Sequence, residues 1–543
     1  MEQAVNESPP LATRLSRTLA ALAFAWFASG CMTTAPRFKD QPVVWRVDDT
    51  RDIPPVRERE FLVHQYAADI IVLRRTTRAL ELHGSTPARN ANALDEVPDS
   101  SWFTNRIGVR AMSSEEAARG PDVDGPPRLP IVITQPKLGG TNPGFVVKDA
   151  TGRKFVVKFD PPGSLELQTS VGVIVNRFFW AMGFNVPSDH VFSFRRSDLT
   201  IDPKAHLDKE GKQPFTEAVL ERVLAGVTRS VDGSFRASSS EYVKGVPRGG
   251  FAAEGVRSDD ANDRVPHEHR RELRGLRVFA AWLDHTDMKE DNGLDVYVTE
   301  NGRHFLRHFL IDFGETLGGH AAEKGRMTDG YEYGWDTEAA LAGAVTFGLW
   351  KRPWEDRVAS PWPSVGPVST TAFDPRTWRE AYPYWPFFER DAADEYWAAK
   401  IVMRFDRPLV DALVATGRLS DPRAATYLAD AIMVRRQKVG ATYIEAVTAL
   451  DDFVVKGGRL CAVDMGTRFG LARGGVAERL DERGRVVEAA AIAIDGAVCF
   501  APLRGGYEVL RLRVNRGVGV VRPPMQVHVM DAARVVGVLR IER

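Results

Sequence analysis

One short stretch, together with a tripeptide that follows it, constrains the fold of this chain more than any other feature. Residues 285–292 read HTDMKEDN, and Asp312-Phe313-Gly314 comes after a strand-like run, FLRHFLI. The two motifs supply four chemically active side chains in this order: Asp287, Lys289, Asn292 and Asp312. Carboxylate and amide oxygens suit Mg²⁺, and a carboxylate beside a cation can orient a hydroxyl group towards a phosphoryl group. We therefore expect the fold to bring these four side chains together.

A second informative stretch, residues 131–160, contains three strand-like runs separated by turns: IVIT, GFVVKD and KFVVKF. The first turn holds Gly139, Gly140 and Gly144, and the third run carries Lys158. Glycines let backbone N–H groups approach phosphates closely, and a lysine can neutralise them. Taken alone, however, the glycines fit an ordinary hairpin loop better, and Lys158 could equally be a solvent-facing strand residue.

Periodic patterns place helices around these motifs. Residues 164–184 carry one apolar face, and residues 260–283 are expected to form a helix that leads into the 285–292 stretch. Residues 391–447 predict three more helices, and residues 57–82 an N-terminal helix. From residue 453 onward, strand-like runs with glycine-rich turns predict a small β-sandwich.

The order of these parts resembles the protein-kinase-like superfamily, in particular its atypical bacterial branch. The resemblance covers residues 131–447 in layout. It implies that Asp287 orients the acceptor hydroxyl, that Lys289 lies at the γ-phosphate and that His285 braces the loop. It also implies ATP binding by Lys158 and the glycine turn, and Mg²⁺ binding by Asn292 and Asp312.

Two features depart from the family pattern. The glycine turn reads G-G-x-x-x-G instead of G-x-G-x-x-G. In kinases a glutamate on the next helix pairs with the strand lysine, but here the only acid in that helix is Glu166, close to its start. Glu166 is therefore the one candidate for an ion pair with Lys158.

The patterns predict an α+β chain in four parts. Residues 1–31 are expected to be a lipoprotein signal peptide, and residues 32–125 a tether with a helical or extended arm. Residues 126–450 are expected to form a two-lobed kinase-like domain, divided near residue 255. Residues 451–543 are expected to form the all-β, sandwich-like domain.

The N-terminus has the pattern of a targeting segment. Arg14 and Arg17 precede an apolar run, residues 19–27, which is too short to span a bilayer but suits a signal peptide. The run ends Ala-Ser-Gly-Cys31, which resembles the bacterial lipobox and implies a lipid on the Cys31 thiol. Met32 follows in place of the aspartate that retains lipoproteins at the inner membrane, which favours the outer membrane of the cell envelope. The alternative is an ordinary signal peptide with an incidental cysteine.

The chain has three cysteines. If Cys31 carries lipid, Cys461 and Cys499 remain as a pair in an oxidising compartment, and we expect them to form a disulfide. Closing that loop would stabilise the fold by about 4 kcal/mol in the chain-entropy treatment. The alternative is two buried free thiols.

The charge balance gives no indication of a nucleic-acid partner, because 72 Lys and Arg residues match 72 Asp and Glu residues. The leading hypothesis is a membrane-anchored, Mg²⁺-dependent protein that binds ATP and transfers a phosphoryl group to a hydroxyl acceptor. The rival hypothesis is an inactive pseudokinase or a scaffolding lipoprotein of the envelope. Scarce ATP outside the inner membrane favours the rival, whereas the complete set of Asp287, Asn292 and Asp312 favours chemistry.

Overall fold

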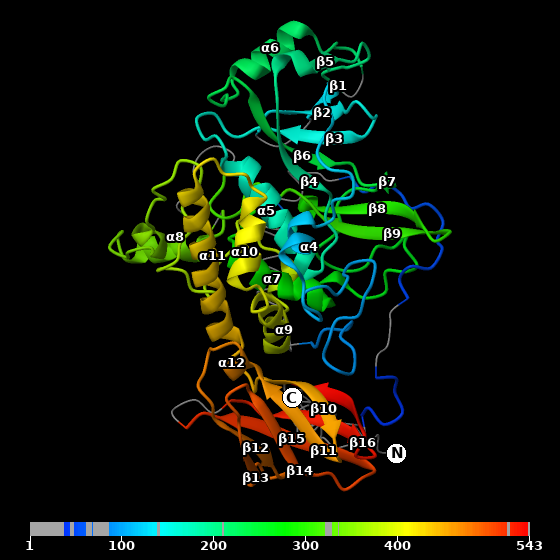
Figure 1. Ribbon diagram of the computed structural model, residues 1–543, viewed down its shortest axis with the longest axis vertical. Helices are drawn as coiled ribbons and strands as arrows, with labels where there is room; N and C mark the ends of the chain where they lie inside the picture. Colours follow the sequence, from blue (N-terminus) through cyan, green and yellow to red (C-terminus); the bar gives the residue numbers. More distant parts are fainter. Residues whose placement is uncertain are drawn as a thin grey trace, which may run out of the picture.

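The computed structural model describes residues 37–43, 48–60, 68, 86–137, 142–208, 211–320, 328–334, 336–517 and 522–540. Cys31, Gly139 and Gly140 lie outside the described residues, as does nearly all of the helix expected at 57–82, of which residues 57–60 are not helical. In Figure 1 a sheet lies at the top, a body of helices in the middle and a second group of strands at the bottom. No helix among the described residues is long and apolar enough to cross a membrane.

The upper sheet has six strands in the order β4-β6-β3-β2-β1-β5. Its strands are β1 (Ile131–Pro136), β2 (Gly144–Lys148), β3 (Lys154–Lys158), β4 (Asp189–Phe194), β5 (Leu199–Ile201) and β6 (Phe235–Glu241). All pairs are antiparallel except β1 with β5. Alternate residues point to one face and build a core that helix α6 (Glu217–Ala225) covers. The three expected strands of residues 131–160 are thus confirmed as β1, β2 and β3.

Helix α5 (Leu167–Met182) packs against β4 and β6 on the other side of this sheet. Fourteen of its 16 residues are buried. The helix cannot begin earlier, because Glu166 has a left-handed backbone with φ of 70° and Gly163 precedes it with φ of 75°. Because α5 begins at Leu167, Glu166 lies outside the helix, and Gln168 is the first polar side chain of α5 at the cleft.

The middle body consists of helices α7 (Arg271–Leu283), α9 (Ala392–Val402), α10 (Arg407–Ala415) and α11 (Pro422–Tyr443), which share one apolar core with α5. The expectation of a helix from residue 260 was wrong: residues 260–270 form turns and one 3₁₀ turn, and α7 begins only at Arg271. The buried His267 ring explains this, because its nitrogens bond Asp263 Oδ2 at 2.8 Å and Ala252 O at 2.5 Å. Those bonds fold the segment back on itself instead of extending the helix.

Strands β8 (Gly293–Glu300) and β9 (Arg303–Leu310) form the hairpin that separates the two motifs, with β7 (Val246–Pro247) at its edge. Asn301 and Gly302 make its turn, with φ of 50° and 75°. Two consecutive residues with positive φ are typical of tight hairpins, where Asn-Gly is favoured. The hairpin returns the chain so that Ile311 N donates to Asn292 O at 3.0 Å.

The C-terminal part forms a three-stranded sheet, β10-β11-β14, and a five-stranded sheet, β13-β12-β15-β16-β17, around one shared core. Its strands are β10 (Leu450–Lys456), β11 (Arg459–Asp464), β12 (Val476–Leu480), β13 (Val486–Ala491), β14 (Ala497–Pro502), β15 (Tyr507–Asn515), β16 (Met525–Met530) and β17 (Arg534–Leu539). One short helix, α12 (Met465–Arg468), interrupts the expected all-β pattern, because the Asp464 side chain accepts from Thr467 N and caps a helical turn.

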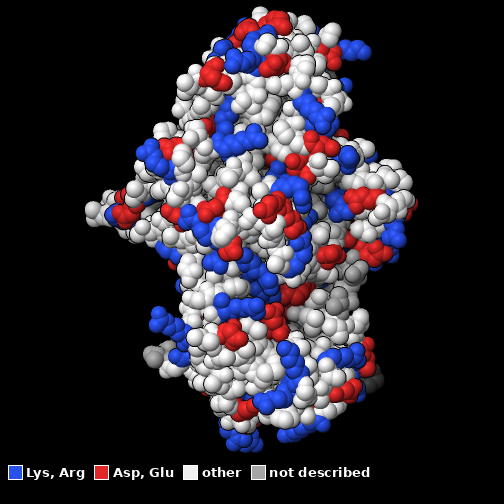
Figure 2. Space-filling view, viewed as in Figure 1, with Lys and Arg blue, Asp and Glu red and all other residues white. Residues whose placement is uncertain are grey.

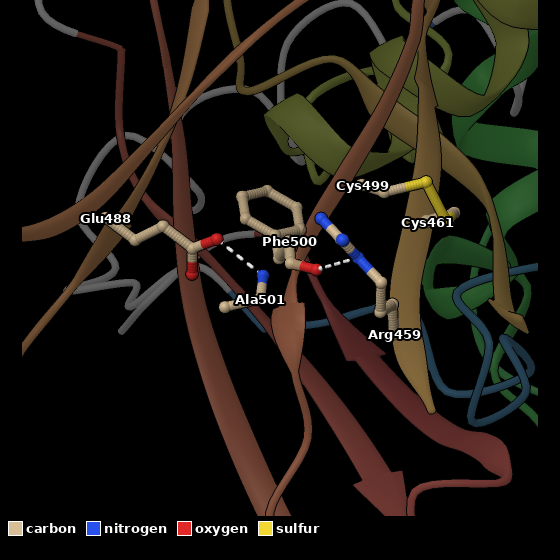
Figure 3. Close-up of a disulfide and its surroundings, with 6 residues drawn as sticks. All are labelled: Arg459, Cys461, Glu488, Cys499, Phe500 and Ala501. Carbon is tan, nitrogen blue, oxygen red and sulfur yellow. Dashed lines mark hydrogen bonds between the residues drawn. A yellow bond between two sulfur atoms is a disulfide. The ribbon is translucent and has the colours of Figure 1, made fainter. Parts of the chain in front are cut away.

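Cys461 and Cys499 lie opposite each other on β11 and β14 and form a disulfide (Figure 3). Beside it, Arg459 Nε donates to Phe500 O at 2.8 Å and ties the same two strands together. The disulfide therefore reinforces an existing strand pair instead of joining distant elements.

Buried charges join the C-terminal strands to the middle body. Lys400 on α9 contacts Glu96 and lies 2.9 Å from Asp451 Oδ2, while Arg540 lies 3.1 Å from Asp95 and 3.4 Å from Asp451. We call these five residues the junction cluster. At the surface, by contrast, Figure 2 shows basic and acidic residues interspersed over the visible face.

Candidate active site

Two of the predicted residues meet where β3 ends and β9 runs out into the second motif. Lys158 Nζ lies 2.7 Å from Asp312 Oδ1. Asp312 has a left-handed backbone with φ of 62°, a conformation that aspartate tolerates better than most residues and that is often found at functional sites. Desolvation raises the pKa of Asp312, but Lys158, Lys137 and Lys289 outweigh it and lower that pKa to about 2. Asp312 is therefore held as a carboxylate among three cations.

The loop before β8 brings together the other three predicted residues. Both Asp287 oxygens face the Lys289 ammonium, at 2.9 and 2.8 Å. Asn292 Nδ2 donates to Asp287 Oδ2 at 2.9 Å and to the Asp287 carbonyl at 2.6 Å. Burial lowers the pKa of Lys289, but the Asp287 charge more than compensates and raises it. The loop thus presents one charged pair fixed by an amide.

Aromatic packing holds the two motifs against each other. The His285 ring is buried and lies 5.7 Å from the Phe313 ring and 5.8 Å from the Phe179 ring on α5, centroid to centroid. Phe313 itself stacks on Phe179 at 5.0 Å. Burial lowers the pKa of His285 to about 4, so the ring is neutral at physiological pH. A neutral, buried histidine suits a bracing role and cannot act as an exposed base.

The cleft beside Lys158 and Asp312 contains polar residues that the sequence did not indicate. Its lining includes Asn142, Gln168 on α5 and Asp189 on β4. In the strand register, Lys158 lies opposite Ser238 and Asp189 opposite Ser240, so both side chains leave the same face of the sheet with β6 between them. Desolvation raises the pKa of Asp189 to about 6. One oxygen of Asp189 and the Gln168 amide nitrogen are buried without a hydrogen-bond partner among the described residues, so the cleft contains two unsatisfied polar groups.

Glu166, the expected partner of Lys158, is directed elsewhere. Its Oε2 accepts from Ser420 N at 2.9 Å and from Ser420 Oγ at 3.0 Å, in the loop between α10 and α11. The left-handed backbone at Glu166 directs the side chain away from the sheet. At the corresponding place α5 contributes Gln168, which carries no charge. The structure therefore does not bring Glu166 into the site.

A further carboxyl group, Glu315, directly follows the second motif. Burial and the neighbouring Asp287 charge raise the pKa of Glu315 to about 7, with Lys289 opposing them. Perturbed pKa values of this size are common where carboxylates share a functional site. The nearby sequence gave no signal for this, because Glu315 is adjacent to Asp287 only in space.

Asn292 and Asp312 carry oxygen atoms of the kind that Mg²⁺ takes as ligands. Asn292 commits its amide nitrogen to Asp287, which leaves its side-chain oxygen for a cation, and Asp312 supplies a carboxylate. Among the described residues, no cluster of three or more His, Cys, Asp or Glu side chains could hold a metal. Mg²⁺ bound with a nucleotide commonly takes only one or two protein ligands, and phosphate and water oxygens complete its shell.

Comparisons with known proteins identify few relatives. No family model matches the chain, and no curated protein matches it. Among solved structures, the chain is similar to the Golgi casein kinase, at 10% sequence identity with a TM-score of 0.29. That alignment covers 72% of this chain and 93% of the other.

Proposed function

We propose that this protein binds ATP with Mg²⁺ in the cleft between the six-stranded sheet and the middle helices, which we interpret as the two lobes of a kinase-like domain, and transfers the terminal phosphoryl group to a hydroxyl acceptor. The observation that carries the proposal is the pairing of Lys158 with Asp312 at 2.7 Å across the boundary between sheet and helices. The contacts that hold the Asp287 carboxyl group to Lys289 and Asn292 support it. Lysine side chains and two aspartates at one edge are the groups that phosphoryl transfer uses.

In this mechanism the acceptor hydroxyl oxygen forms a bond to the γ-phosphorus, and Asp287 accepts the proton that this hydroxyl group loses. The bond from that phosphorus to the β–γ bridging oxygen breaks, and ADP leaves with the electron pair. Lys289 balances the charge of the phosphoryl group in transit, and Lys158 turns from Asp312 to the α- and β-phosphates. Mg²⁺, held by Asp312 and Asn292, would supply electrostatic stabilisation of the phosphate oxygens.

The test is calorimetric titration of Mg·ATP against wild type and three variants. Asp312→Ala should weaken binding at least 100-fold, because the metal loses its carboxylate. Asp287→Asn should bind normally and lose turnover by at least 10³-fold, because the base acts on the acceptor. Lys158→Ala should weaken binding about tenfold, in line with one charged contact to phosphate.

Three results would count against the proposal in different ways. Wild type that binds no nucleotide with any divalent metal would leave a scaffolding role. If wild type and Asp312→Ala bind Mg·ATP equally well, our assignment of the site is wrong. Binding without turnover in every acceptor screen would favour the pseudokinase alternative.

We also infer that a lipid on Cys31 anchors the protein to the envelope membrane, on the strength of the Ala-Ser-Gly-Cys31 sequence. Cys31→Ser should shift the protein from the detergent phase to the aqueous phase in a detergent-partition assay. Equal partition of the variant and wild type would contradict the inference.

A further inference from the structure

Asp189 on β4 is an acid of the cleft that the proposed reaction does not use. It lines the same cavity as Lys158, a space of about 50 Å³ that Ser238 and Ser240 on β6 also border. One Asp189 carboxyl oxygen is buried there without a hydrogen-bond partner among the described residues. Because nearly all buried polar atoms are paired in native proteins, this oxygen is open to a donor that another state of the site supplies.

The strand register places Lys158 and Asp189 diagonally across β6. Lys158 pairs with Ser238 and Asp189 with Ser240, two residues along the same strand, and both side chains leave the cleft face. Neighbouring strands lie about 4.8 Å apart and two residues span about 7 Å, so the two Cα atoms are about 12 Å apart. An extended lysine and an aspartate side chain together bridge a separation of that size.

The electrostatics of the cleft agree with this placement. Burial raises the pKa of Asp189 to about 6, and the Lys158 ammonium is among the charges that oppose this effect. An opposite charge stabilises the ionised form of a carboxyl group only when it lies nearby. Lys158 is therefore close enough to interact with Asp189 even while its nitrogen contacts Asp312.

A second cation near Asp189, Arg177 on α5, is directed to other oxygens. Its guanidinium donates to Ala118 O at 3.0 Å, Asn176 Oδ1 at 3.0 Å and the Asp189 backbone carbonyl at 2.8 Å. These contacts hold Arg177 beside the backbone of β4 instead of the Asp189 carboxyl group. Lys158, on a long side chain at the edge of the cleft, is the cation that can turn to that carboxyl group.

Lys158 needs such a partner when Asp312 is engaged elsewhere. In this structure its nitrogen contacts Asp312, the carboxylate that the proposed function assigns to Mg²⁺. A carboxylate that ligates a metal ion is a weaker partner for an ammonium, because the metal charge dominates its surroundings. The place on α5 from which a kinase glutamate would act holds the uncharged Gln168. Asp189 is the remaining acid in the lining of this cavity.

We propose that Asp189 is the positioning residue for Lys158: when Asp312 binds the metal ion, Lys158 exchanges Asp312 for Asp189, which directs its ammonium along the cleft towards the phosphates. This inference deepens the proposed function and rests on it for the roles of Mg²⁺ and ATP. The exchange of one carboxylate for the other is a property of the chain itself and can be measured without either. Asp189 thus supplies from a strand the carboxylate that Glu166 was expected to supply from the helix.

The first experiment uses neither nucleotide nor metal. Acetic anhydride acetylates an uncharged amine, and a carboxylate partner slows the reaction by holding lysine as an ammonium. Peptide mass spectrometry should find slow labelling of Lys158 in wild type and in Asp189→Asn, because Asp312 remains. Asp312→Ala should label within about threefold of wild type, because Asp189 takes the lysine, whereas the double variant should label about tenfold faster than Asp312→Ala. Lys148, at an exposed position on β2, is the internal reference.

The second experiment measures Mg·ATP binding by calorimetry. Asp189→Asn should weaken binding about tenfold, and it should have no further effect in a Lys158→Ala background, because Asp189 acts through Lys158. Adding Gln168→Glu to Asp189→Asn should restore binding to within about threefold of wild type, since glutamate then supplies the carboxylate from α5. Asp430→Asn, at a position on α11 with 57% of its side chain exposed, is the control and should bind like wild type.

Thermal melts establish that each variant is folded, and Asp189→Asn should melt no lower than wild type, because asparagine keeps the shape and removes a buried charge. Equal labelling of Lys158 in Asp312→Ala and in the double variant would overturn the proposal. Additive losses of Mg·ATP binding in Asp189→Asn and Lys158→Ala would also overturn it. The expected labelling pattern in a protein that binds no nucleotide would keep the exchange of partners and remove the proposed function.

Discussion

Two lysine–aspartate ion pairs in this molecule have similar nitrogen–oxygen distances, but one is partly exposed to solvent and the other is buried. Lys158 meets Asp312 at 2.7 Å at the cleft, and Lys400 meets Asp451 at 2.9 Å in the junction cluster. The first pair keeps 27% and 45% of its side-chain surface exposed, whereas the second keeps 7% and 12%. The distance between two charges therefore says little about their role unless burial and further partners are considered.

The further partners make the difference. Asp451 also accepts from the Tyr396 hydroxyl at 3.0 Å and faces Arg540 at 3.4 Å, and Lys400 also contacts Glu96. Removing one member of such a buried set leaves an uncompensated charge, whereas an exposed pair with one contact exchanges partners at little cost. The junction cluster is suited to fixing one conformation, and the Lys158–Asp312 pair to admitting a ligand.

The largest effect should follow from breaking the junction cluster. Lys400→Met should lower the free energy of unfolding by about 3 kcal/mol, because the buried Asp451 carboxylate would lose its ammonium partner and keep only the longer contact to Arg540. Urea denaturation measures this. Lys148→Met, at an exposed position on β2, is the control and should change stability by less than about 0.5 kcal/mol. A loss below about 1 kcal/mol for Lys400→Met would mean that the cluster is hydrated in solution.

An intermediate effect should come from pH at the cleft. The folded-state pKa of Glu315, about 7, lies above the unfolded value near 4.3, so folding favours the protonated form. The cost of ionising Glu315 therefore grows as pH rises from about 4.3 to about 7 and is constant above that. Glu315→Gln should be more stable than wild type by about 2 kcal/mol at pH 8 and equal to it at pH 4.

Denaturation curves at the two pH values provide the comparison for Glu315. Asp291→Asn is a suitable second variant, because partial desolvation by neighbouring groups also raises the pKa of this carboxyl at the surface, with Lys289 opposing. A difference between Glu315→Gln and wild type that does not change between pH 4 and pH 8 would show that Glu315 has an ordinary pKa.

The smallest effect on stability should come from the cleft pair itself. Lys158→Met should change the free energy of unfolding by less than about 1 kcal/mol, because solvent screens a pair with 45% exposure at Asp312. The same urea experiment used for Lys400 gives the comparison directly. If Lys158→Met lowers the free energy of unfolding as much as Lys400→Met does, then Lys158 stabilises the fold and the two ion pairs do not differ in role.

The sequence was informative wherever local pattern determines geometry. Strand-like runs between turn residues predicted β1, β2 and β3, and the strand-like run before Asp312 became β9. The proximity of Lys158 and Asp312 was expected only from the resemblance to kinases, because the two residues lie 154 positions apart and no local repeat joins them.

Contacts that depend on distant strand pairing could not be predicted. Asp189 reaches the cleft only because β6, more than forty residues later in the chain, lies between β3 and β4. Glu166 was misassigned because one left-handed residue reverses its direction, and single positive-φ residues other than glycine leave no sequence signal. The late start of α7 likewise depends on the His267–Asp263 contact, which periodicity does not show.

The junction cluster has a consequence for gene fusion and recombination within this chain. Asp451 and Arg540 come from the C-terminal strands, whereas Asp95, Glu96 and Lys400 come from two earlier segments. A deletion or gene fusion with its break point near residue 449 would separate Lys400 from Asp451 and Asp95 from Arg540, which removes two of the four ion pairs of the junction cluster. Moving the C-terminal strands into another protein without the segment around residue 95 and helix α9 would therefore cost these two buried or partly buried contacts.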